Sequence, residues 1–416
     1  MKKEKYVKIK IKMKIGYKTE LKPNNKQITL LLKHCGVARF AYNWGLSKRI
    51  QEYKETKQSS NAIEQHRQLN LAKKEEFPWM YEVSKCAPQE ALRDLDTAFK
   101  NFFRRCKKKE KSGYPKFKSK KKGIGSFRLT GSIQIESNRV KLPRIGWIRL
   151  KEKNYLPVGQ PQQTSISEKA GRWFISFNSK QEIIIPEIKT GEIIGIDLGI
   201  NKLAICSDGT IFENPKSLSK RLKKLRRIQQ SLSRKQKESN NRKKARRIVT
   251  NLHYKISNIR KDALHKATST IVRTKPLVAV LEDLNVSGMM KNRKLSRSIQ
   301  DASFYEFRRM LEYKMERIGS KVLLAGKFYP SSKLCSSCGN KKAELSLDIR
   351  EYNCEVCGLI MDRDINASLN LKSIYNKIKD TVSSTGIKVC GENVRPKRTR
   401  VFLGNLDEAK IEQKSY

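Results

Sequence analysis

The chain has 416 residues, enough for more than one domain and for at least one full-sized hydrophobic core. Lysine and arginine outnumber aspartate and glutamate by 91 to 40, and the resulting net charge of +51 indicates a polyanionic partner such as nucleic acid. Because the sequence contains neither an apolar run of transmembrane length nor a secretory segment, no membrane partner is expected, and the nine cysteines are assigned to a reducing, cytoplasmic compartment.

The first predicted element is a strand over residues 7–15, in which apolar residues alternate with lysines. A period of two gives a strand one buried face and one lysine face. Two interpretations of the lysine face stay open. Either it lines a nucleic-acid groove, or it protects an edge strand from pairing with other chains.

A helical pattern follows from Asn25 to about Lys57, and Gly36 is expected to break it into two helices. Another helix is predicted to begin at Pro88, a favourable first-turn residue. Its apolar stripe is expected to pack in the core and consists of Ala91, Leu92, Leu95, Ala98, Phe99, Phe102, Phe103 and Cys106. The basic segment 104–122 contains aromatic residues and suits a loop that contacts phosphates and stacks on bases, with a solvated linker as the alternative.

Residues 124–180 are predicted to form short strands, because apolar residues alternate in pairs between turn-forming stretches. The pairs are Phe127 and Leu129, Ile133 and Ile135, Val140 and Leu142, and Ile148 and Leu150. Regularly spaced short strands are typical of a small barrel. We expect the strand at 7–15 to join this barrel, so that the helices of 25–110 form an insertion.

The second half begins with an apolar strand that ends in Asp197. Residues 216–270 are basic and carry two apolar stripes separated by a polar stretch at 233–241, which predicts an antiparallel helical hairpin. Its lysine and arginine faces would be free to contact a duplex. A second apolar strand, 277–281, leads into Glu282.

A helix, a strand and a tail complete the predicted elements. Ser303 and Glu306 have the spacing of a capping box and are expected to open a helix that ends near Arg317. Residues 322–325 have the composition of a short strand. Residues after about 376 are polar and basic without a clear period, so the tail is expected to be partly disordered.

Four cysteines form the strongest local signal, a pair made of Cys335 and Cys338 and a pair made of Cys354 and Cys357. Fifteen residues separate the two CxxC pairs, which fits a zinc site. Four thiolates saturate a tetrahedral Zn²⁺, so the site is expected to be structural, and the spacing argues against a redox dithiol. The other cysteines are expected to be ordinary thiols: Cys35, Cys86, Cys106, Cys206 and Cys390.

The candidate catalytic residues are Asp197, Glu282 and Asp364. The first two end apolar strands, and Asp364 opens a helical segment that should point it towards them. A buried carboxylate without a partner costs several kcal/mol, and a divalent cation is one partner that removes this cost. Three carboxylates can hold two Mg²⁺, or Mn²⁺, and so stabilise both oxygens of an in-line phosphodiester displacement.

Three neighbouring acids receive other roles. Asp283 follows Glu282 directly and should face the opposite way if the strand continues. Asp362 could cap the helix that carries Asp364, or it could contact the metal ligands without binding the metal itself. Asp208 lies in a Ser-Asp-Gly turn, where aspartate is common for backbone reasons.

The combination of motifs resembles a known family. Residues 195–199 and 281–284 resemble the first two motifs of a RuvC-like, RNase H-type nuclease. Residues 330–339, the second cysteine pair and residues 362–367 are similar to the TnpB family of transposon-encoded proteins. Further similarities to that family lie at residues 35–44, 91–95 and 113–118.

The resemblance covers residues 5–400, and it implies that the three acids are catalytic Mg²⁺ ligands and that the two cysteine pairs bind Zn²⁺. Met361, Ser368 and Leu334 stand where the family usually has His, Ala and Thr, and these departures remove neither an acid nor a zinc ligand. The implied activity is RNA-guided DNA cleavage. A guide RNA from the transposon end would direct the protein, expected to be a monomer, to a double-stranded DNA target beside a short motif.

Guide use agrees with the residues, because no segment has the pattern of a helix-turn-helix or another module that reads a long DNA sequence alone. A basic channel that holds a heteroduplex by its shape would leave sequence recognition to base pairing. We expect the segments 216–270, 104–122 and 8–14 to line this channel.

The expected fold class is α+β multidomain: a small β-barrel (the wedge) with an inserted helical recognition domain, then an RNase H-like (RuvC) α/β domain with an embedded four-cysteine zinc ribbon. The expected boundaries are 1–20 and 123–188 for the barrel, 21–122 for the recognition insertion, 189–329 and 361–376 for the RuvC-like domain, 330–360 for the zinc ribbon and 377–416 for the tail.

Four other functions were weighed. A miniature type V CRISPR effector shares the nuclease half. A guided DNA-binding repressor would have lost an acid, and all three are present. A transposase could use the same acids and Mg²⁺ for strand transfer, and the sequence does not distinguish water from a DNA 3′-hydroxyl as the nucleophile. In a zinc-ribbon RNA-binding protein the acids would be structural.

Overall fold

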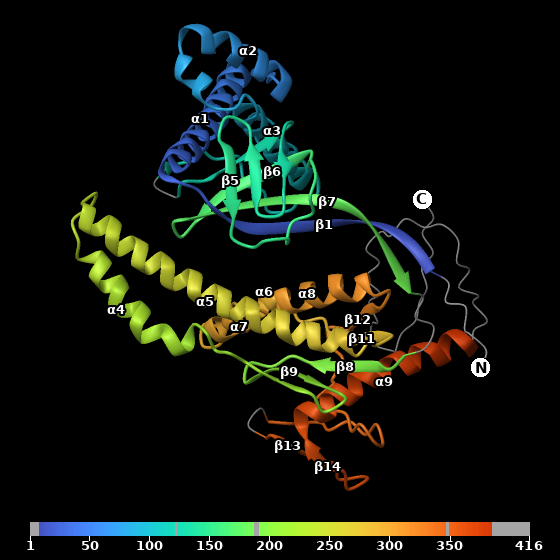
Figure 1. The fold of residues 1–416 in the computed structure, drawn as a ribbon. Helices are drawn as coiled ribbons and strands as arrows, with labels where there is room; N and C mark the ends of the chain where they lie inside the picture. The colour runs from blue at the N-terminus through green and yellow to red at the C-terminus, as the bar shows by residue number, and fades with distance from the viewer. Residues whose placement is uncertain (1–7, 121–122, 187–190, 347–348, 385–416) are drawn as a thin grey trace. The chain divides into compact units, whose positions relative to one another are not determined.

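The computed structural model describes residues 8–120, 123–186, 191–346 and 349–384 (Figure 1). The chain divides into two compact units, one made of Lys12–Glu182 and the other of Met1–Ile11 with Ile183–Tyr416. Both units combine helices with a sheet, so the chain is a mixed α/β multidomain protein, as predicted. In the part of the chain that the structure describes, no helix has both the length and the apolar character needed to cross a membrane.

The unit Lys12–Glu182 is built on a seven-stranded sheet in the order β2-β6-β7-β1-β5-β4-β3. Its strands are β1 (Lys8–Lys22), β2 (Ser126–Thr130), β3 (Gln134–Ile135), β4 (Arg139–Leu142), β5 (Gly146–Leu150), β6 (Gln163–Lys169) and β7 (Arg172–Pro186). The predicted alternation is confirmed, for example in β4, where Val140 and Leu142 are buried and Arg139 and Lys141 are exposed. The first strand joins this sheet as predicted and continues seven residues beyond its expected end at 15.

The helices of this unit lie between β1 and β2 in the chain. They are α1 (Asn25–Thr56), α2 (Ala62–Glu75), the 3-10 helix η1 (Pro78–Glu82) and α3 (Cys86–Lys107). Helix α2 was not predicted, because two of its four buried residues, Gln65 and Lys73, are polar and conceal the helical period. Helix α3 begins two residues before Pro88, which lies in its first turn.

The expected break at Gly36 is wrong, because α1 is one continuous helix of 32 residues. Gly36 is itself only half-buried, but its neighbours Cys35 and Val37 belong to the face of the helix that packs in the core. A glycine costs a helix about 1 kcal/mol, which is less than the burial of such a face contributes. Tertiary packing therefore carries the helix through this position.

The expected core role of the α3 stripe is correct for its first half only. Of the stripe, Ala91, Leu92, Leu95 and Phe99 are buried, whereas Cys106 is exposed and the Phe103 side chain is 56% exposed. The rings of Phe102 and Phe103 lie 5.2 Å apart between centroids, and Tyr114 lies 5.5 Å from Phe102. The end of α3 is thus an aromatic cluster open to solvent.

The loop after α3 is held against α1. The Lys118 N–H donates to Asn43 Oδ1 at 2.8 Å, and Asn43 Nδ2 donates to the Lys118 carbonyl at 2.9 Å. The Lys118 ammonium also lies 3.9 Å from the centroid of the Tyr42 ring. These contacts fix the middle of the loop, while Tyr114 and Phe117 remain about half exposed.

The second unit contains a five-stranded sheet in the order β10-β9-β8-β11-β12. Its strands are β8 (Ile193–Asp197), β9 (Lys202–Cys206), β10 (Ile211–Glu213), β11 (Val278–Glu282) and β12 (Lys321–Ala325). Strands β8, β11 and β12 run parallel, so their carboxyl ends meet at one edge of the sheet. The strands predicted before Asp197, before Glu282 and at 322–325 are confirmed.

Alternate residues of β11 divide the core of this sheet between two layers of helices (Figure 1). Ala279 and Leu281 pack with residues of α5 (Asn240–Arg273) and α8 (Phe304–Arg317). Val278 and Val280 pack instead with Leu371 of α9 (Arg363–Ser384). Each residue of β11 is therefore assigned to one face by its position in the strand.

The predicted helical hairpin is confirmed as α4 (Leu222–Ser233) and α5, preceded by the short helix η3 (Ser219–Arg221). Leu225 of α4 packs against Leu252 and Ile256 of α5. The residues on either side of Leu225 are exposed lysines and arginines: Lys223, Lys224, Arg226 and Arg227. The hairpin thus closes on its apolar stripes and presents basic faces to solvent.

The predicted capping box at Ser303 is wrong, although α8 begins and ends as expected. Ser303 ends the preceding helix, α7 (Ser296–Ala302), in the left-handed region with φ 58°. Its hydroxyl donates to the Gln300 carbonyl and accepts no hydrogen bond from the first turn of α8. Helix α7 and the short α6 (Val286–Met289) were not predicted.

The last described helix, α9, continues to Ser384, eight residues past the expected end of the nuclease segment at 376. The expectation of partial disorder falls mostly on residues 385–416, which lie outside the described residues. Between β12 and α9 a small two-stranded sheet is formed by β13 (Glu351–Asn353) and β14 (Ile360–Asp362). This insertion carries the four cysteines.

Gly195 sets how closely α9 crosses β8, and its replacement tests the packing. A Cβ at this position would lie 1.9 Å from the Ser368 carbonyl oxygen and 2.6 Å from the Lys372 nitrogen. Because both are backbone atoms of α9, they cannot move aside as a side chain could. We expect Gly195→Ala to lower the free energy of unfolding by at least about 1–3 kcal/mol in denaturant titrations.

Gly36→Ala is the matched control, because a Cβ at Gly36 meets no atom within 4 Å. Within a continuous helix this change should stabilise the protein by about 0.5–1 kcal/mol. An unchanged stability in Gly195→Ala would contradict the close crossing of α9.

Candidate active site and zinc centre

Two of the three candidate acids leave the sheet side by side. Ile196 of β8 is paired with Leu281 of β11, so the next residues along these parallel strands are Asp197 and Glu282. Both acids have the same strand parity as Val278 and Val280, whose side chains lie on the α9 face. The two carboxylates therefore project to the side of the sheet that α9 covers.

Helix α9 supplies the third acid from its first turn. Its backbone contacts β8 at Gly195, opposite Ser368, and Asp364 lies one turn before Ser368. The start of the helix is fixed by Asp362, whose Oδ1 accepts from the N–H groups of Asp364 and Ile365 at 2.9 and 3.1 Å. The capping interpretation of Asp362 is confirmed.

The charges of the three acids act on one another. Burial raises the pKa of Asp197 to about 8, and the negative charges of Glu282 and Asp364 add to this effect, while Arg363 opposes it. Burial also raises the pKa of Glu282, against a hydrogen bond from Ser331 that favours the charged form. Two buried acids with raised pKa values, beside the carboxylate of Asp364, form a site that gains from a positive charge.

The donor set fits divalent cations that prefer oxygen. Carboxylates are the ligands that hold Mg²⁺ or Mn²⁺ in proteins, and the three acids come from separate, rigid elements. A bound cation would reverse the unfavourable mutual repulsion of these carboxylates, which is the physical reason for such a site at this edge of the sheet.

The neighbouring acids take no part in this group. Asp283 points to the opposite face, where its Oδ1 accepts from Arg308 Nη1 of α8 at 2.9 Å. Asp208 accepts from the Thr210 N–H at 2.9 Å and shapes its turn. Both predictions for these residues are confirmed.

The four cysteines lie together, with every sulfur atom within 4.8 Å of the others. The Sγ atoms of Cys335 and Cys357 are 3.5 Å apart, and those of Cys338 and Cys354 are 3.6 Å apart. Tetrahedral zinc with Zn–S bonds of about 2.3 Å requires sulfur atoms about 3.8 Å apart. The arrangement therefore fits one structural Zn²⁺ with four protein ligands.

The two knuckles of the zinc centre have the backbone that the sequence predicted. Gly339 and Gly358 follow their CxxC pairs with φ of 75° and 70°, the left-handed region that favours glycine. The Gly339 N–H donates to the Cys335 carbonyl at 3.0 Å, and the Gly358 N–H donates to the Cys354 carbonyl at 2.9 Å. Backbone N–H groups, of Cys357 above all, lower the pKa of the Cys354 thiol to about 6, which favours the thiolate that zinc requires.

Two asparagines of α9 join the first knuckle to the helix and were missed by the sequence analysis. Asn366 and Asn370 are buried one turn apart, and both donate to the Leu334 carbonyl. The sequence signal for this contact was a pair of asparagines four residues apart, each followed by an apolar residue, Ala367 or Leu371. This pattern predicts two buried amides on one helix face, and buried amides need hydrogen-bond partners.

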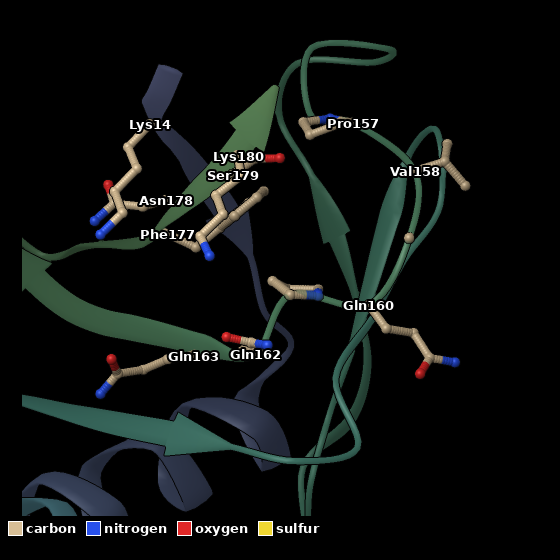
Figure 2. A pocket seen from close by; sticks show the side chains of 12 residues that line it. Lys14, Pro157, Val158, Gln160, Gln162, Gln163, Phe177, Asn178, Ser179 and Lys180 are labelled. Atoms are coloured by element: carbon tan, nitrogen blue, oxygen red, sulfur yellow. The ribbon is translucent and has the colours of Figure 1, made fainter. Parts of the chain in front are cut away.

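The unit Lys12–Glu182 contains an open, polar cavity of about 440 Å³ (Figure 2). Figure 2 shows Lys14 and Asn178 on one side of it and Gln162 and Gln163 on another. Gln163 is already engaged, because its Nε2 donates to Glu90 Oε2 at 2.9 Å. No carboxylate or thiol lines the cavity, so its amides and lysines suit binding and not acid–base chemistry.

Removing one thiol should remove the zinc. We expect the wild-type protein to hold about one Zn²⁺ per chain, and Cys338→Ser to lose it, because three thiolates and a hydroxyl bind zinc poorly. Elemental analysis of purified protein measures the metal. Cys106→Ser is the control, since this exposed thiol lies outside the cluster, and equal zinc loss in both variants would contradict the assignment.

The charge of Asp197 should make the metal-free protein less stable as the pH rises. A carboxyl whose pKa is 3.8 when unfolded and about 8 when folded favours folding at low pH, and this contribution is lost between about pH 4 and pH 8. At pH 8 we expect metal-free Asp197→Asn to melt at a higher temperature than the wild type, with the difference shrinking towards pH 4.

Mg²⁺ should raise the melting temperature of the wild type and have little effect on Asp197→Asn. Asp283→Asn is the matched control, because it loses the ion pair with Arg308 but should keep the response to Mg²⁺. An equal response to Mg²⁺ in the wild type and Asp197→Asn would contradict a metal site at these acids.

Three family models match the chain. The one described as “Probable transposase” matches residues 175–293, and the one described as “Cas12f1-like, TNB domain” matches residues 304–371. A third, described as “Helix-turn-helix domain”, matches residues 13–58, where the structure has most of β1 and the uninterrupted helix α1.

Two curated relatives match almost the whole chain. A “Putative RNA-guided DNA endonuclease” of Streptomyces pristinaespiralis is 36% identical over 391 residues, which is 93% of each protein. The “Putative RNA-guided DNA endonuclease InsQ” of Escherichia coli (strain K12) is 31% identical over 92% of this chain and 95% of the relative. A solved cryo-EM structure of a Cas12f1–sgRNA–target DNA complex has 16% identity and a TM-score of 0.49, and the alignment covers 87% of this chain and 99% of that one. On the strength of the two curated relatives, the chain belongs to the TnpB family.

Proposed function

We propose that the chain is an RNA-guided DNA endonuclease that cleaves a double-stranded target by metal-dependent phosphodiester hydrolysis. The observation that carries the proposal is the convergence of Asp197, Glu282 and Asp364 from two parallel strands and one helix. The two curated relatives with matching names support the reaction, since they span the chain almost completely. A chain with a net charge of +51 also suits a polyanionic substrate.

In this mechanism Asp197, Glu282 and Asp364 would hold two Mg²⁺ or Mn²⁺ ions. When bound, the ions supply the positive charge that activates water and stabilises the leaving oxygen of the phosphodiester. Asp197 and Glu282 act from rigid strand ends, and Asp364 from a capped helix, so their geometry is set before substrate arrives. Ser331 holds one oxygen of Glu282.

Sequence recognition would come from a bound guide RNA. The long basic hairpin α4–α5 presents exposed lysines and arginines that suit the phosphates of a duplex. The aromatic cluster at the end of α3 suits base stacking, and the polar cavity beside Lys14 suits a sugar, base or phosphate group. These surfaces read shape and charge, which leaves the target sequence to base pairing.

The finer architecture is part of the same proposal. The seven-stranded sheet would be the wedge barrel (1–20 and 123–188), and α1 to α3 would form the recognition insertion (21–122). The five-stranded sheet, in the order β10-β9-β8-β11-β12, would with α5, α8 and α9 be the RNase H-like, RuvC-type nuclease domain (189–329 and 361–376). The four-cysteine insertion would be its zinc ribbon (330–360).

Strand transfer is the second candidate, because the matching model for residues 175–293 is described as “Probable transposase”. The same three carboxylates and two ions would then activate a DNA 3′-hydroxyl in place of water. The two candidates differ in their products: hydrolysis leaves free ends, and transfer joins an end to new DNA.

The test uses the protein purified with its co-expressed RNA. The bound RNA is sequenced, and matching DNA is incubated with and without Mg²⁺. We expect cleavage only with both the RNA and Mg²⁺. Removing a residue that only orients a metal ligand slows an enzyme by roughly 10–100-fold. Asp197→Ala should slow DNA cleavage by more than this, because Asp197 would bind the ions directly.

Asp208→Ala is the matched control, because this aspartate serves only its turn and should leave the cleavage rate unchanged. Cleavage by Asp197→Ala at the wild-type rate would refute the catalytic site. Failure to recover a specific RNA would refute guidance, and products joined to new DNA would favour strand transfer.

A further inference from the structure

Ser331 is a buried polar residue at the candidate active site that is neither an acid nor a zinc ligand. We propose that Ser331 is a positioning residue that orients Glu282 for metal binding, and that the zinc knuckle holds Ser331 in place through Asn366 and Asn370. The inference rests on the proposed function, because it assigns Glu282 to the metal site.

The hydroxyl of Ser331 donates to Glu282 Oε1. Among the described residues the Glu282 carboxylate accepts no other side-chain hydrogen bond, so its second oxygen stays available to a ligand. The donor is neutral. A lysine or arginine at this place would hold the carboxylate more strongly but would compete with a cation for its charge, whereas a hydroxyl fixes the orientation and leaves the negative charge in place.

Ser331 is itself fixed from α9. Asn370 Nδ2 donates to the Ser331 carbonyl at 2.8 Å and to the Leu334 carbonyl at 2.7 Å. Asn370 is 4% exposed, and both of its donors face this loop. The backbone that carries the Ser331 hydroxyl therefore cannot move without breaking buried hydrogen bonds, which is costly.

Asn366 extends the connection to the zinc knuckle. Its Nδ2 donates to the Leu334 carbonyl at 2.6 Å, and its Oδ1 accepts from the Ser336 N–H at 2.9 Å. Ser336 lies inside the first CxxC, between Cys335 and Cys338. A continuous set of hydrogen bonds thus leads from a zinc knuckle to an acid at the active site.

The same helix carries Asp364 in its first turn, two residues before Asn366. Helix α9 therefore presents a candidate metal ligand, Asp364, and its two asparagines hold the loop that orients a second one, Glu282. The zinc knuckle, Glu282 and Asp364 are tied to a common rigid element. This gives the zinc centre a role at the active site beyond the folding of its own loop.

The test measures metal binding apart from cleavage. Mn²⁺ is titrated by calorimetry into the purified protein–RNA complex of the wild type, Ser331→Ala, Ser332→Ala and Asn370→Ala. We expect Ser331→Ala to weaken Mn²⁺ binding by about tenfold, as the loss of a group that orients a metal ligand does. The Mg²⁺ concentration for half-maximal cleavage should rise by a similar factor.

Ser332→Ala is the matched control. Among the described residues this neighbouring serine makes no side-chain hydrogen bond, so the Mn²⁺ affinity of the variant should equal that of the wild type. Asn370→Ala should weaken Mn²⁺ binding while one Zn²⁺ per chain is retained. Ser331→Thr keeps the hydroxyl and should bind Mn²⁺ more tightly than Ser331→Ala. Zinc content and circular dichroism verify that each variant is folded.

Wild-type Mn²⁺ affinity in a folded Ser331→Ala would overturn the positioning role, as would equal weakening by Ser331→Thr and Ser331→Ala. Asp197→Ala separates this failure from failure of the proposed function. If Asp197→Ala abolishes Mn²⁺ binding while Ser331→Ala does not alter it, the metal site stands and only the role of Ser331 is wrong. If Asp197→Ala binds Mn²⁺ like the wild type, the metal site itself is wrong.

Discussion

Helix α9 crosses strand β8 at Gly195, where a Cβ would lie 1.9 Å from the carbonyl oxygen of Ser368. Only glycine allows two backbones to approach this closely. The crossing brings the first turn of α9 to the carboxyl ends of β8 and β11, where Asp197 and Glu282 leave the sheet. The position of Asp364 relative to the other two acids therefore depends on one residue without a side chain.

This arrangement places three carboxylates, two of which repel the charge of Asp197, within a well-packed unit. Burial and like charges raise the pKa of Asp197 to about 8, so the metal-free site opposes folding at high pH. The apolar layers on the two faces of the sheet, with α5 and α8 on one and α9 on the other, offset that cost. Functional sites commonly hold such unfavourable charge, and the surrounding core keeps it in place.

Local patterns predicted much of this structure. Strands with alternating residues, such as β4, and apolar strands that end in acids, such as β8 and β11, carry their signal in a few consecutive residues. The spacing of the two CxxC pairs likewise predicted the four-cysteine cluster. The period of a strand predicted that Asp283 lies on the opposite face from Glu282. The grouping of Asp197 with Glu282 could be predicted because the carboxyl ends of parallel strands meet at one edge of the sheet.

Features that depend on distant partners could not be predicted in the same way. Gly36 is an ordinary helix breaker by composition, and only its buried neighbours explain the continuous α1. Ser303 has the spacing of a cap, yet its hydroxyl is used by the preceding helix. Asn366 and Asn370 find their partners 30 or more residues away in the chain. At Gly36 tertiary packing outweighed a correct local preference, whereas at Ser303 the competing partner, Gln300, belongs to the helix just before it.

The place of the zinc centre in the chain also bears on how the protein folds. The four cysteines lie in residues 326–362, the connection between β12 and α9, so α9 has to reach Gly195 across a long loop. Closing a loop costs more conformational entropy as the loop lengthens. Zinc bound at this cluster would join Cys335 to Cys357 and so would shorten the free path between strand and helix. The metal would thus act as an entropic clip that makes docking of the last helix, and with it assembly of the acid site, a local event.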